Sequence, residues 1–548
     1  MSKVLFISSL AVIVALCVST PAFAQDVFSP GQRAEWLKKA EAVKPNLTES
    51  VKKPVRLVQL QKNSNAYQGW EMKENGLLRD FFNTSIKKQD GVIIDFGEHL
   101  TGYFSCNFEL IGKTDSDAPV RFRFTFGEVP AELATPFDPY PGGLSRAWLQ
   151  DETVTVDFVP STISISRRLS FRYVKVELLG YSSFDFRISD MLLKAVTSVN
   201  RQAEPLDGST PEIIADIDRI GLITLKECMQ TVYEDGPKRD CRLWIGDLYL
   251  EALANTYSFK NHDLTKRCLY LLAGVAAPNG FLHATMFENP GPPHPQTGMH
   301  ILDYALLYNV ALLDYLKTTG DKETVNDLWT VAKKQIDVAK TYINDEWVYN
   351  GKPTWIFFDW RDGLHTDAAL QGLFIKTFKD TYELAKLLGK ENEVEEIPAM
   401  VKNLTKAATN KFFNKKEGLF VSGPSQQVSY MSQVWMILGG VVQRQDAQKV
   451  LKAAMATENA VYPGSPYGTH YLIEAMIACG MTQEAKEYLV EYWGGMVKKG
   501  ADTFWEVYDP KNDFLSPYNF FPVNSYCHAW SCTPVYFIRK YPEIFQKQ

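Results

Sequence analysis

The segment EDGPKRDCRLWIGD, residues 234–247, gathers acidic and basic side chains around a Gly-Pro pair and one tryptophan. Its acidic residues include Asp235, Asp240 and Asp247, and Arg239 lies directly before the second of these. Carboxylates that crowd together repel one another when ionised, so at least one is expected to keep its proton to higher pH than an isolated Asp. A group of that kind can act as a general acid. The alternative is a solvated loop in which Asp247 caps the following helix.

Apolar residues at helical spacing begin before this segment, at Ile213, and continue through the rest of the chain. An apolar helix, a short polar turn and a second amphipathic helix recur in residues 306–336, 373–404, 432–455 and 470–493. Such a hairpin cannot bury its apolar face alone, so neighbouring hairpins must pack together. About six hairpins fit in this half, which predicts a closed (α/α)6 toroid with an open solenoid as the alternative.

Residues 55–194 follow a different pattern, in which apolar and polar residues alternate between turn residues. Val, Ile, Phe, Tyr and Thr at this period predict the antiparallel strands of a β-sandwich. The period changes near Pro211. We therefore expect a multidomain fold, with an N-terminal antiparallel β-sandwich over residues 25–208 and the helical toroid over residues 209–548.

The first 24 residues have the pattern of a cleaved export signal, with Lys3, an apolar run over 4–18, and Ala22 and Ala24 around Phe23. This predicts an exported protein, either periplasmic or secreted. Cys17 makes a lipoprotein the alternative, but a bulky Leu precedes it where a lipoprotein signal prefers Gly or Ala. No later apolar run approaches the ~18 residues that cross a bilayer, so we expect no membrane span.

Composition argues against several other classes of function. The formal net charge of -6 offers no basis for binding nucleic acid or an anionic membrane. Beyond the predicted signal, the cysteines are odd in number and scattered, which argues against a disulfide framework. No CxxC or HExxH spacing indicates a metal site, and no cofactor is expected. Aromatic residues make up 13% of the chain, which fits surfaces that stack on sugars and fits a large core at least as well.

The segment DGPKRDCRLWIGD resembles the α-L-rhamnosidases of glycoside hydrolase family 78, in which Asp-x-Pro-x-Arg-Glu is followed by Trp-x-Gly-Asp at the same spacing. Three more segments resemble that family in the same order: IDFGEHLTGYFSCNFELIG, ADTFWEVYD and NSYCHAWSCTPVYF, at residues 94–112, 501–509 and 524–537. The resemblance covers nearly the whole chain beyond the predicted signal. It implies that the (α/α)6 barrel is the catalytic domain and that the substrate is an oligosaccharide or polysaccharide.

By this resemblance, the family's general acid falls on Asp240 and its general base on Glu506. Asp235 and Asp247 match acidic residues that contact sugar hydroxyls. The chain departs from the family where it has Asp240 in place of Glu, which is one methylene shorter and leaves open both the acid and the sugar accepted. Many relatives also continue into a further β-domain, whereas this sequence stops soon after its last predicted helix, so no contribution from such a domain to the pocket is expected.

Hydrolysis of a glycosidic bond needs one carboxylic acid that protonates the leaving oxygen and one carboxylate on the opposite face of the sugar ring. Asp240 and Glu506 come from opposite ends of the helical half, and a closed ring brings such ends together. In an inverting reaction, Glu506 would activate a water molecule while Asp240 protonates the leaving group. The further candidates for substrate binding are Arg239, Asp359, His528, Trp244, Trp360, Trp505 and Trp530, although core packing is the commoner role of a tryptophan.

Two other functions remain open at this point. A hydrolase for a different sugar on the same scaffold is favoured by the Asp at position 240. A non-catalytic carbohydrate-binding protein would keep the pocket and lack the acid. The sequence leaves the linkage and the oligomeric state open.

Overall fold

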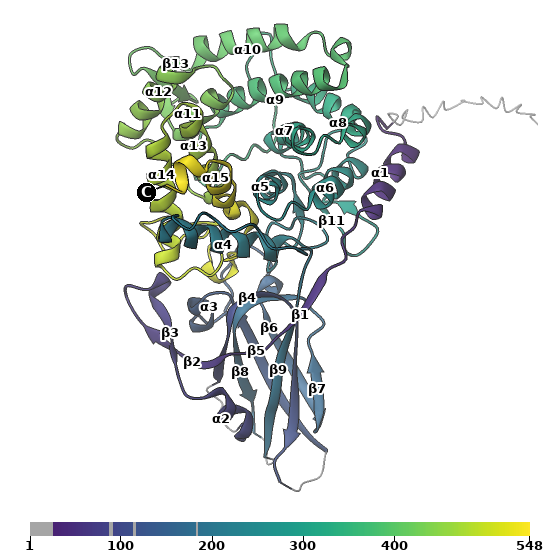
Figure 1. The fold of residues 1–548 in the computed structure, drawn as a ribbon, viewed down its shortest axis with the longest axis vertical. Helices are drawn as coiled ribbons and strands as arrows, with labels where there is room; N and C mark the ends of the chain where they lie inside the picture. The colour runs from purple at the N-terminus through teal and green to yellow at the C-terminus, as the bar shows by residue number, and fades with distance from the viewer. Residues whose placement is uncertain (1–25, 87–90, 113–116, 182–184, 548) are drawn as a thin grey trace, which may run out of the picture.

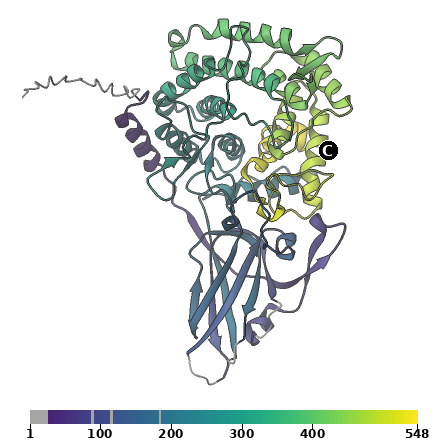
Figure 2. The same ribbon diagram turned by 180° about the vertical axis from the view of Figure 1, so that it is seen from behind.

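The computed structural model describes residues 26–547, apart from 87–90, 113–116 and 182–184. The predicted export signal lies outside the described residues. In Figure 1 a β domain lies at the bottom and a ring of helices at the top, and Figure 2 shows the same arrangement from behind. Within the described ranges, no helix is both long enough and apolar enough to cross a membrane.

The β domain is an antiparallel sheet that bends across its longest strand, β4 (Val92–Leu110). The first half of β4 pairs with β8 (Leu169–Leu179) and the second half with β9 (Phe186–Thr197). The other strands are β1 (Thr48–Lys52), β2 (Arg56–Lys62), β3 (Trp70–Glu74), β5 (Asp117–Gly127), β6 (Asp151–Phe158) and β7 (Ser161–Ser164). The hydrogen-bonded order is β1-β9-β4-β8-β5-β6, and both β2 and β7 also pair with β4.

Alternate side chains of these strands enclose one apolar core. Phe122 and Phe124 of β5 are fully buried, and their rings contact Phe108 and Phe104 of β4. Strands β4 and β5 are not neighbours in the sheet, so these contacts run across the interior of the bent sheet. The period-two pattern in the sequence corresponds to this inward-facing set of side chains.

The helical half is a closed ring of inner and outer helices. The inner ones are α5 (Ile245–Thr256), α7 (Leu302–Thr319), α9 (Asp367–Leu388), α11 (Tyr430–Leu438), α13 (Pro466–Ala478) and α15 (Pro534–Lys540), the last preceded by the short helix η5 (Ala529–Cys532). The outer ones are α4 (Glu212–Cys228), α6 (His262–Gly274), α8 (Lys322–Lys340), α10 (Ile397–Phe412), α12 (Arg444–Ala456) and α14 (Thr482–Lys498). Each inner helix from α5 to α13 contacts the next, α13 contacts η5, and both η5 and α15 contact α5. The expected (α/α)6 toroid is therefore confirmed, and the open solenoid is excluded.

Local sequence signals define the turn between α7 and α8. Gly320 has a φ of 70° and ends α7, because glycine adopts this left-handed conformation without a steric penalty. The next residue, Asp321, caps α8 by accepting a hydrogen bond from the backbone N–H of Thr324 at 3.0 Å. The inner helix α7 and the outer helix α8 are thus joined by a tight turn that makes them antiparallel.

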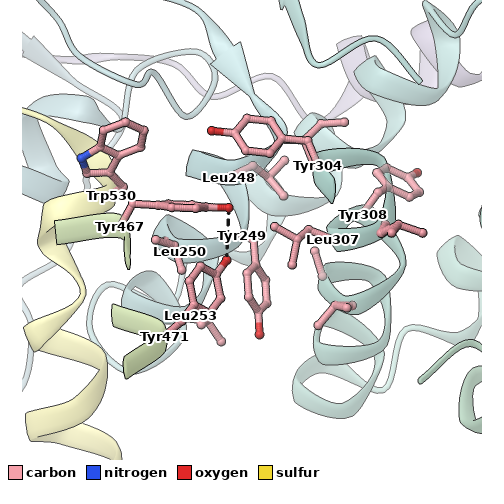
Figure 3. Packing of buried hydrophobic residues seen from close by; sticks show 14 of the residues in the cluster. Leu248, Tyr249, Leu250, Leu253, Tyr304, Leu307, Tyr308, Tyr467, Tyr471 and Trp530 are labelled. Atoms are coloured by element: carbon pink, nitrogen blue, oxygen red, sulfur yellow. Dashed lines mark hydrogen bonds between the residues drawn. The ribbon is translucent and has the colours of Figure 1, made fainter. Parts of the chain in front are cut away.

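The interior of the ring is filled by large side chains from different helices. Figure 3 shows Tyr249 and Leu253 of α5 near Tyr471 of α13, whose hydroxyl is hydrogen-bonded to that of Tyr467 at 3.4 Å. These side chains are buried. The ring is therefore a packed core rather than an open channel, which leaves the loops at its ends to form binding surfaces.

Part of the helical half departs from the expected pattern. Residues 499–533 are mainly turns and bends, interrupted by η5 and by η4 (Phe521–Val523), although helical spacing was expected to continue to the end. The backbone of this segment forms hydrogen bonds mainly within the segment, such as those from Glu506 N to Ser525 O and from His528 N to Phe504 O, instead of a helical ladder. Two small sheets were also not predicted: β10 (Leu243–Trp244) with β11 (Thr285–Phe287) and β12 (His294–Pro295), and β13 (Phe413–Asn414) with β14 (Leu419–Ser422) and β15 (Gln427–Val428).

The N-terminal helix α1 (Pro30–Ala42) packs on α6 of the ring, beside which it lies in Figure 1. The chain therefore contacts the helical half before it enters the β domain. The remaining short helices are α2 (Leu78–Asn83), α3 (Pro130–Ala134), α16 (Pro542–Phe545), η1 (Tyr67–Gly69), η2 (Arg146–Trp148) and η3 (Glu391–Glu393). The seven described cysteines are all free.

Candidate active site

A small pocket of about 60 Å³ lies where three loops of the ring meet. The loop between α4 and α5 supplies Asp235, Arg239, Asp240, Trp244 and, at the start of α5, Asp247. The segment after α14 supplies Glu506, Tyr518, His528 and Trp530, and the segment before α9 supplies Trp355, Phe357 and Trp360. The pocket is small, and both aromatic rings and charged side chains line it.

Asp235 organises the loop between α4 and α5. Its two carboxylate oxygens accept hydrogen bonds from the backbone N–H groups of Asp240 and Arg242, at 3.0 and 3.1 Å. Its own backbone carbonyl accepts from Ala529 N at 2.8 Å, which ties this loop to the last inner segment. Cys241 has a φ of 59°, a conformation that is uncommon for a residue other than glycine. The loop is thus held in a specific shape by the carboxylate that the sequence predicted as a sugar ligand.

Glu506 is buried and held by three donors. Arg239 and the hydroxyl of Tyr518 each donate a hydrogen bond to its carboxylate, and the backbone N–H of Ser525 donates at 3.1 Å. The guanidinium of Arg239 also lies over the ring of Tyr518, 4.3 Å from its centroid. These contacts fix the direction of the Glu506 carboxylate and balance its charge.

Arg239 also joins Glu506 to Asp240. One guanidinium nitrogen contacts Glu506, and the other lies 3.5 Å from Asp240 Oδ1. Arg242 lies 3.7 Å from the second oxygen of Asp240. The side chain of Asp240 keeps 16% of its surface exposed, compared with 2% for Glu506, so Asp240 is the carboxylate nearer to solvent. The two predicted catalytic carboxylates therefore lie on either side of one cation.

Three polar atoms that border the pocket lack a hydrogen-bond partner among the described residues: Asp247 Oδ1, His528 Nδ1 and Trp360 Nε1. The first two are 3.6 Å apart. An unpaired buried polar atom is costly, so three of them in residues that line one pocket favour a polar ligand there. Together they offer one carboxylate oxygen, one ring nitrogen and one indole N–H.

Burial and neighbouring charges shift the proton affinities of this site. Burial, together with the charge of Asp240, raises the pKa of Asp235 well above its ordinary value. Burial also raises the pKa of Asp247, with further contributions from Asp235 and Glu506. Burial and the charge of Arg239 lower the pKa of His528 well below its usual value, which favours the neutral ring. The expectation that crowding keeps at least one of these carboxyls protonated agrees with these directions.

Aromatic rings form the walls. Trp530 stacks on Phe357 with ring centroids 5.9 Å apart and lies 4.2 Å from the ring of His528. Trp244 meets Tyr304 of α7 edge to face at 6.5 Å. Such rings offer apolar faces to the C–H side of a sugar while the polar atoms bind its hydroxyls.

Two of the predicted ligands lie outside the pocket lining. Trp505 is buried and stacks on Tyr67 of the β domain, with centroids 3.9 Å apart. Asp359 accepts hydrogen bonds from Gly464 N and Ser465 Oγ, both at 2.5 Å, and so ties the loop before α9 to the start of α13. Their contacts are those of residues that join elements together, and their predicted role as sugar ligands gains no support from this placement.

Sequence reasoning did not identify Tyr304, Trp355, Phe357 and Tyr518 as part of the site. Trp355 and Phe357 lie in the same aromatic loop as Trp360. The aromatic composition of this loop predicts them as further lining residues. Tyr518 lies in irregular structure with no recognisable spacing from Glu506. No group of three or more His, Cys, Asp or Glu residues in the described part of the chain is arranged to hold a metal ion.

Comparisons with known proteins agree with this geometry. Residues 54–195 match the model of the glycosyl hydrolase family 78 α-rhamnosidase N-terminal domain, and residues 208–541 match the model of the bacterial α-L-rhamnosidase six-hairpin glycosidase domain. A search among curated proteins found no match.

Solved structures of similar fold include a rhamnosidase from Klebsiella oxytoca with rhamnose bound. It is 36% identical, with a TM-score of 0.90, over 93% of this chain and 99% of that one. A family 78 rhamnosidase of Bacillus sp. GL1 is 19% identical with a TM-score of 0.69, and the match covers 85% of this chain and 49% of that one. A Streptomyces avermitilis α-L-rhamnosidase complexed with L-rhamnose is 15% identical with a TM-score of 0.62, over 90% of this chain and 44% of that one. The last two matches support the fold alone.

Proposed function

This chain belongs to glycoside hydrolase family 78, and from that premise we propose that it is an exported enzyme that removes a terminal α-L-rhamnosyl residue, or a closely related sugar, from plant or microbial glycans with inversion. The observation that carries the proposal is the pair Asp240 and Glu506, joined by Arg239 at the edge of a small aromatic pocket.

In the proposed mechanism, Glu506 removes a proton from a water molecule as that water attacks the anomeric carbon. Asp240 gives its proton to the glycosidic oxygen as the bond to the leaving group breaks. The donors around Glu506 hold its carboxylate in place. Asp240 lies nearer to solvent, on the side from which a leaving group can depart.

The unpaired atoms of Asp247, His528 and Trp360 support recognition of the sugar. The Asp247 carboxyl can pair with a sugar hydroxyl whether it is protonated or ionised, and the neutral ring of His528 can accept a hydrogen bond. Trp244, Trp355 and Phe357 supply apolar surface that suits the methyl group of a 6-deoxy sugar. Export is supported by the pattern of residues 1–24 and remains part of the proposal.

A panel of aryl glycosides tests the function: α-L-rhamnoside, α-L-fucoside, β-D-glucuronide and α-L-arabinofuranoside. We expect the rhamnoside to be hydrolysed with the highest kcat/KM. Glu506→Gln should lower kcat about 10²–10⁴-fold, the usual contribution of a general base. Binding without hydrolysis in the wild type would instead identify a carbohydrate-binding protein, and preference for another glycoside would reassign the sugar.

A further inference from the structure

We propose that Glu128, directly after β5 in the β domain, is a positioning residue. It holds in place the two catalytic loops, which are the loop between α4 and α5 with Asp240 and the segment after α14 with Glu506. This inference rests on the proposed roles of Asp240 and Glu506. Glu128 is buried, and its side chain has no exposed surface. It lies outside the pocket lining, so it acts on the site through other residues rather than by contact with a sugar bound there.

One oxygen of Glu128 binds both loops that carry the candidate catalytic residues. Glu128 Oε2 lies 2.9 Å from Lys238 Nζ, in the loop of Asp240. The same oxygen accepts a hydrogen bond from the backbone N–H of Tyr526 at 2.8 Å, in the segment that follows Glu506. The other oxygen accepts from Ser170 Oγ at 3.2 Å and pairs with His99 Nε2 at 3.0 Å, which anchors Glu128 to the β domain.

Glu506 binds the neighbours of these same residues. Arg239, next to Lys238, donates to Glu506, and the backbone N–H of Ser525, next to Tyr526, donates to Glu506 as well. In each loop, therefore, one residue is tied to Glu506 and the adjacent residue is tied to Glu128. Loss of the Glu128 contacts would free one side of both loops together.

The loops are also bound directly to each other. Arg239 Nε donates to the carbonyl of Val523 at 2.8 Å, and Ser525 Oγ donates to the carbonyl of Arg239 at 2.8 Å. These bonds hold the two loops together, while Glu128 fixes the joined unit relative to the β domain. The chain thus uses its non-catalytic domain to set the geometry of the reacting carboxylates.

Glu132 of α3 supports this arrangement and provides a contrast. Its Oε1 lies 2.8 Å from Lys238 Nζ, and its Oε2 accepts from the backbone N–H groups of Glu128 and Val129 at 2.6 and 3.0 Å. Among the described residues, the side-chain hydrogen bonds and ion pair of Glu132 thus reach one of the two catalytic loops, that of Asp240. Lys238 keeps one carboxylate partner when Glu128 is replaced.

The test compares kcat and KM for four variants of the full chain, on an aryl α-L-rhamnoside, at a temperature where circular dichroism shows all of them folded. Glu128→Met removes both acceptor oxygens at similar size, and we expect kcat to fall about 10- to 100-fold, the scale of a misplacement of about 1 Å. KM should change less than about threefold, because Asp247, His528 and Trp360, the residues proposed to bind the sugar, have no hydrogen bond to Glu128. Glu128→Gln should restore kcat to within about threefold of wild type, because its amide oxygen can accept from Lys238 and Tyr526 while its NH₂ faces Ser170 and His99.

Asp218→Asn is the matched control. Asp218 is also a buried carboxylate paired with a cation, Arg539, but neither residue lines the pocket, so any loss of stability should leave kcat unchanged. If Glu128→Met does not fold, the triple variant Glu128→Met/Glu132→Gln/Lys238→Met removes the cation together with both of its carboxylate partners, so that no buried charge is left unpaired. It should lose kcat to the same extent, because the bond to Tyr526 N is still absent.

Unchanged kcat in Glu128→Met or in the triple variant, or equal losses in Glu128→Met and Glu128→Gln, would overturn the inference. Failure of the proposed function has a different signature, because the wild type itself would then not hydrolyse the rhamnoside, or Glu506→Gln, the fourth variant, would retain activity. A fall in kcat for Glu128→Met with rescue by Gln supports the positioning role.

Discussion

Asp247 shows at the scale of a single residue how function and stability conflict in this site. Its carboxyl is buried, one of its oxygens has no partner among the described residues, and its pKa is raised by burial and by Asp235 and Glu506. A carboxyl whose pKa is raised in the folded state stabilises the fold below its unfolded pKa of about 3.9 and loses that contribution as pH rises. At neutral pH the side chain therefore costs stability.

We expect Asp247→Asn to raise the Tm at pH 7 by about 2 °C or more, because the amide has no proton to lose. The difference in Tm between variant and wild type should shrink as the pH falls toward about 4, where both side chains are neutral. The variant should lose most of its activity, since an amide replaces a carboxyl that faces the pocket. Scanning calorimetry from pH 4 to 7 measures the difference, and a variant less stable than wild type at pH 7 would show that the carboxylate is favourable there.

At the scale of elements, the inner helices α9 and α11 pack closely at Gly372, which has no side chain to separate them. A Cβ added at Gly372 of α9 would lie 2.3 Å from the backbone oxygen of Trp435 in α11. Backbone atoms at that distance cannot move aside without shifting a helix. The close contact between α9 and α11 therefore depends on the absence of a side chain.

We expect Gly372→Ala to destabilise the protein by about 1–3 kcal/mol, the usual cost of overpacking, although alanine is the better helix former. Gly31→Ala in α1 is the matched control, because the nearest atom to an added Cβ there is 4.0 Å away. That variant should be neutral or slightly stabilised. Denaturant unfolding measures the free energy of unfolding of both variants. Equal changes in the two would mean that α9 and α11 can move apart at little energetic cost.

The whole molecule depends on closure of the ring between its first and last helices. Arg539 of α15 forms a paired contact with Asp218 of α4, with distances of 2.8 and 2.7 Å, and both side chains are buried. Contacts of α4 with both α14 and α15 complete the ring. Without this closure, Glu506 and Asp240, which come from opposite ends of the helical half, would not share a pocket.

Arg539→Met should lower the free energy of unfolding by about 3–5 kcal/mol, because it leaves the Asp218 carboxyl buried and unpaired. Replacing both partners by apolar residues, as in Asp218→Leu/Arg539→Met, should recover much of this loss. The kcat of both folded variants should stay close to that of wild type. Calorimetry and kinetics together check this, and a single variant as stable as wild type would show that the pair does not contribute to closure.

The sequence predicts those parts of the molecule in which local pattern determines structure. Period-two and helical spacing predicted the two halves, and the charged segment predicted a loop that carries Asp235 and Asp240. Tyr518 and the contacts of Glu128 could not be predicted, since they depend on how irregular segments far apart in the chain fold against each other. Trp505 shows the opposite limit: the sequence made it one of four candidate tryptophans for sugar binding, yet its ring stacks on Tyr67 of the β domain.

The central claim, that Asp240 is the acid and Glu506 the base, is tested most directly by varying the leaving group. An acidic phenol departs without a proton, so Asp240→Asn should lose much activity on a natural rhamnoside and retain far more on an aryl rhamnoside with such a phenol. Glu506→Gln should lose activity on both, because water must be activated whatever departs. The account predicts this divergence in kcat/KM between the two substrates; equal losses on both substrates for Asp240→Asn would contradict it and move the search for the acid to Asp235 and Asp247.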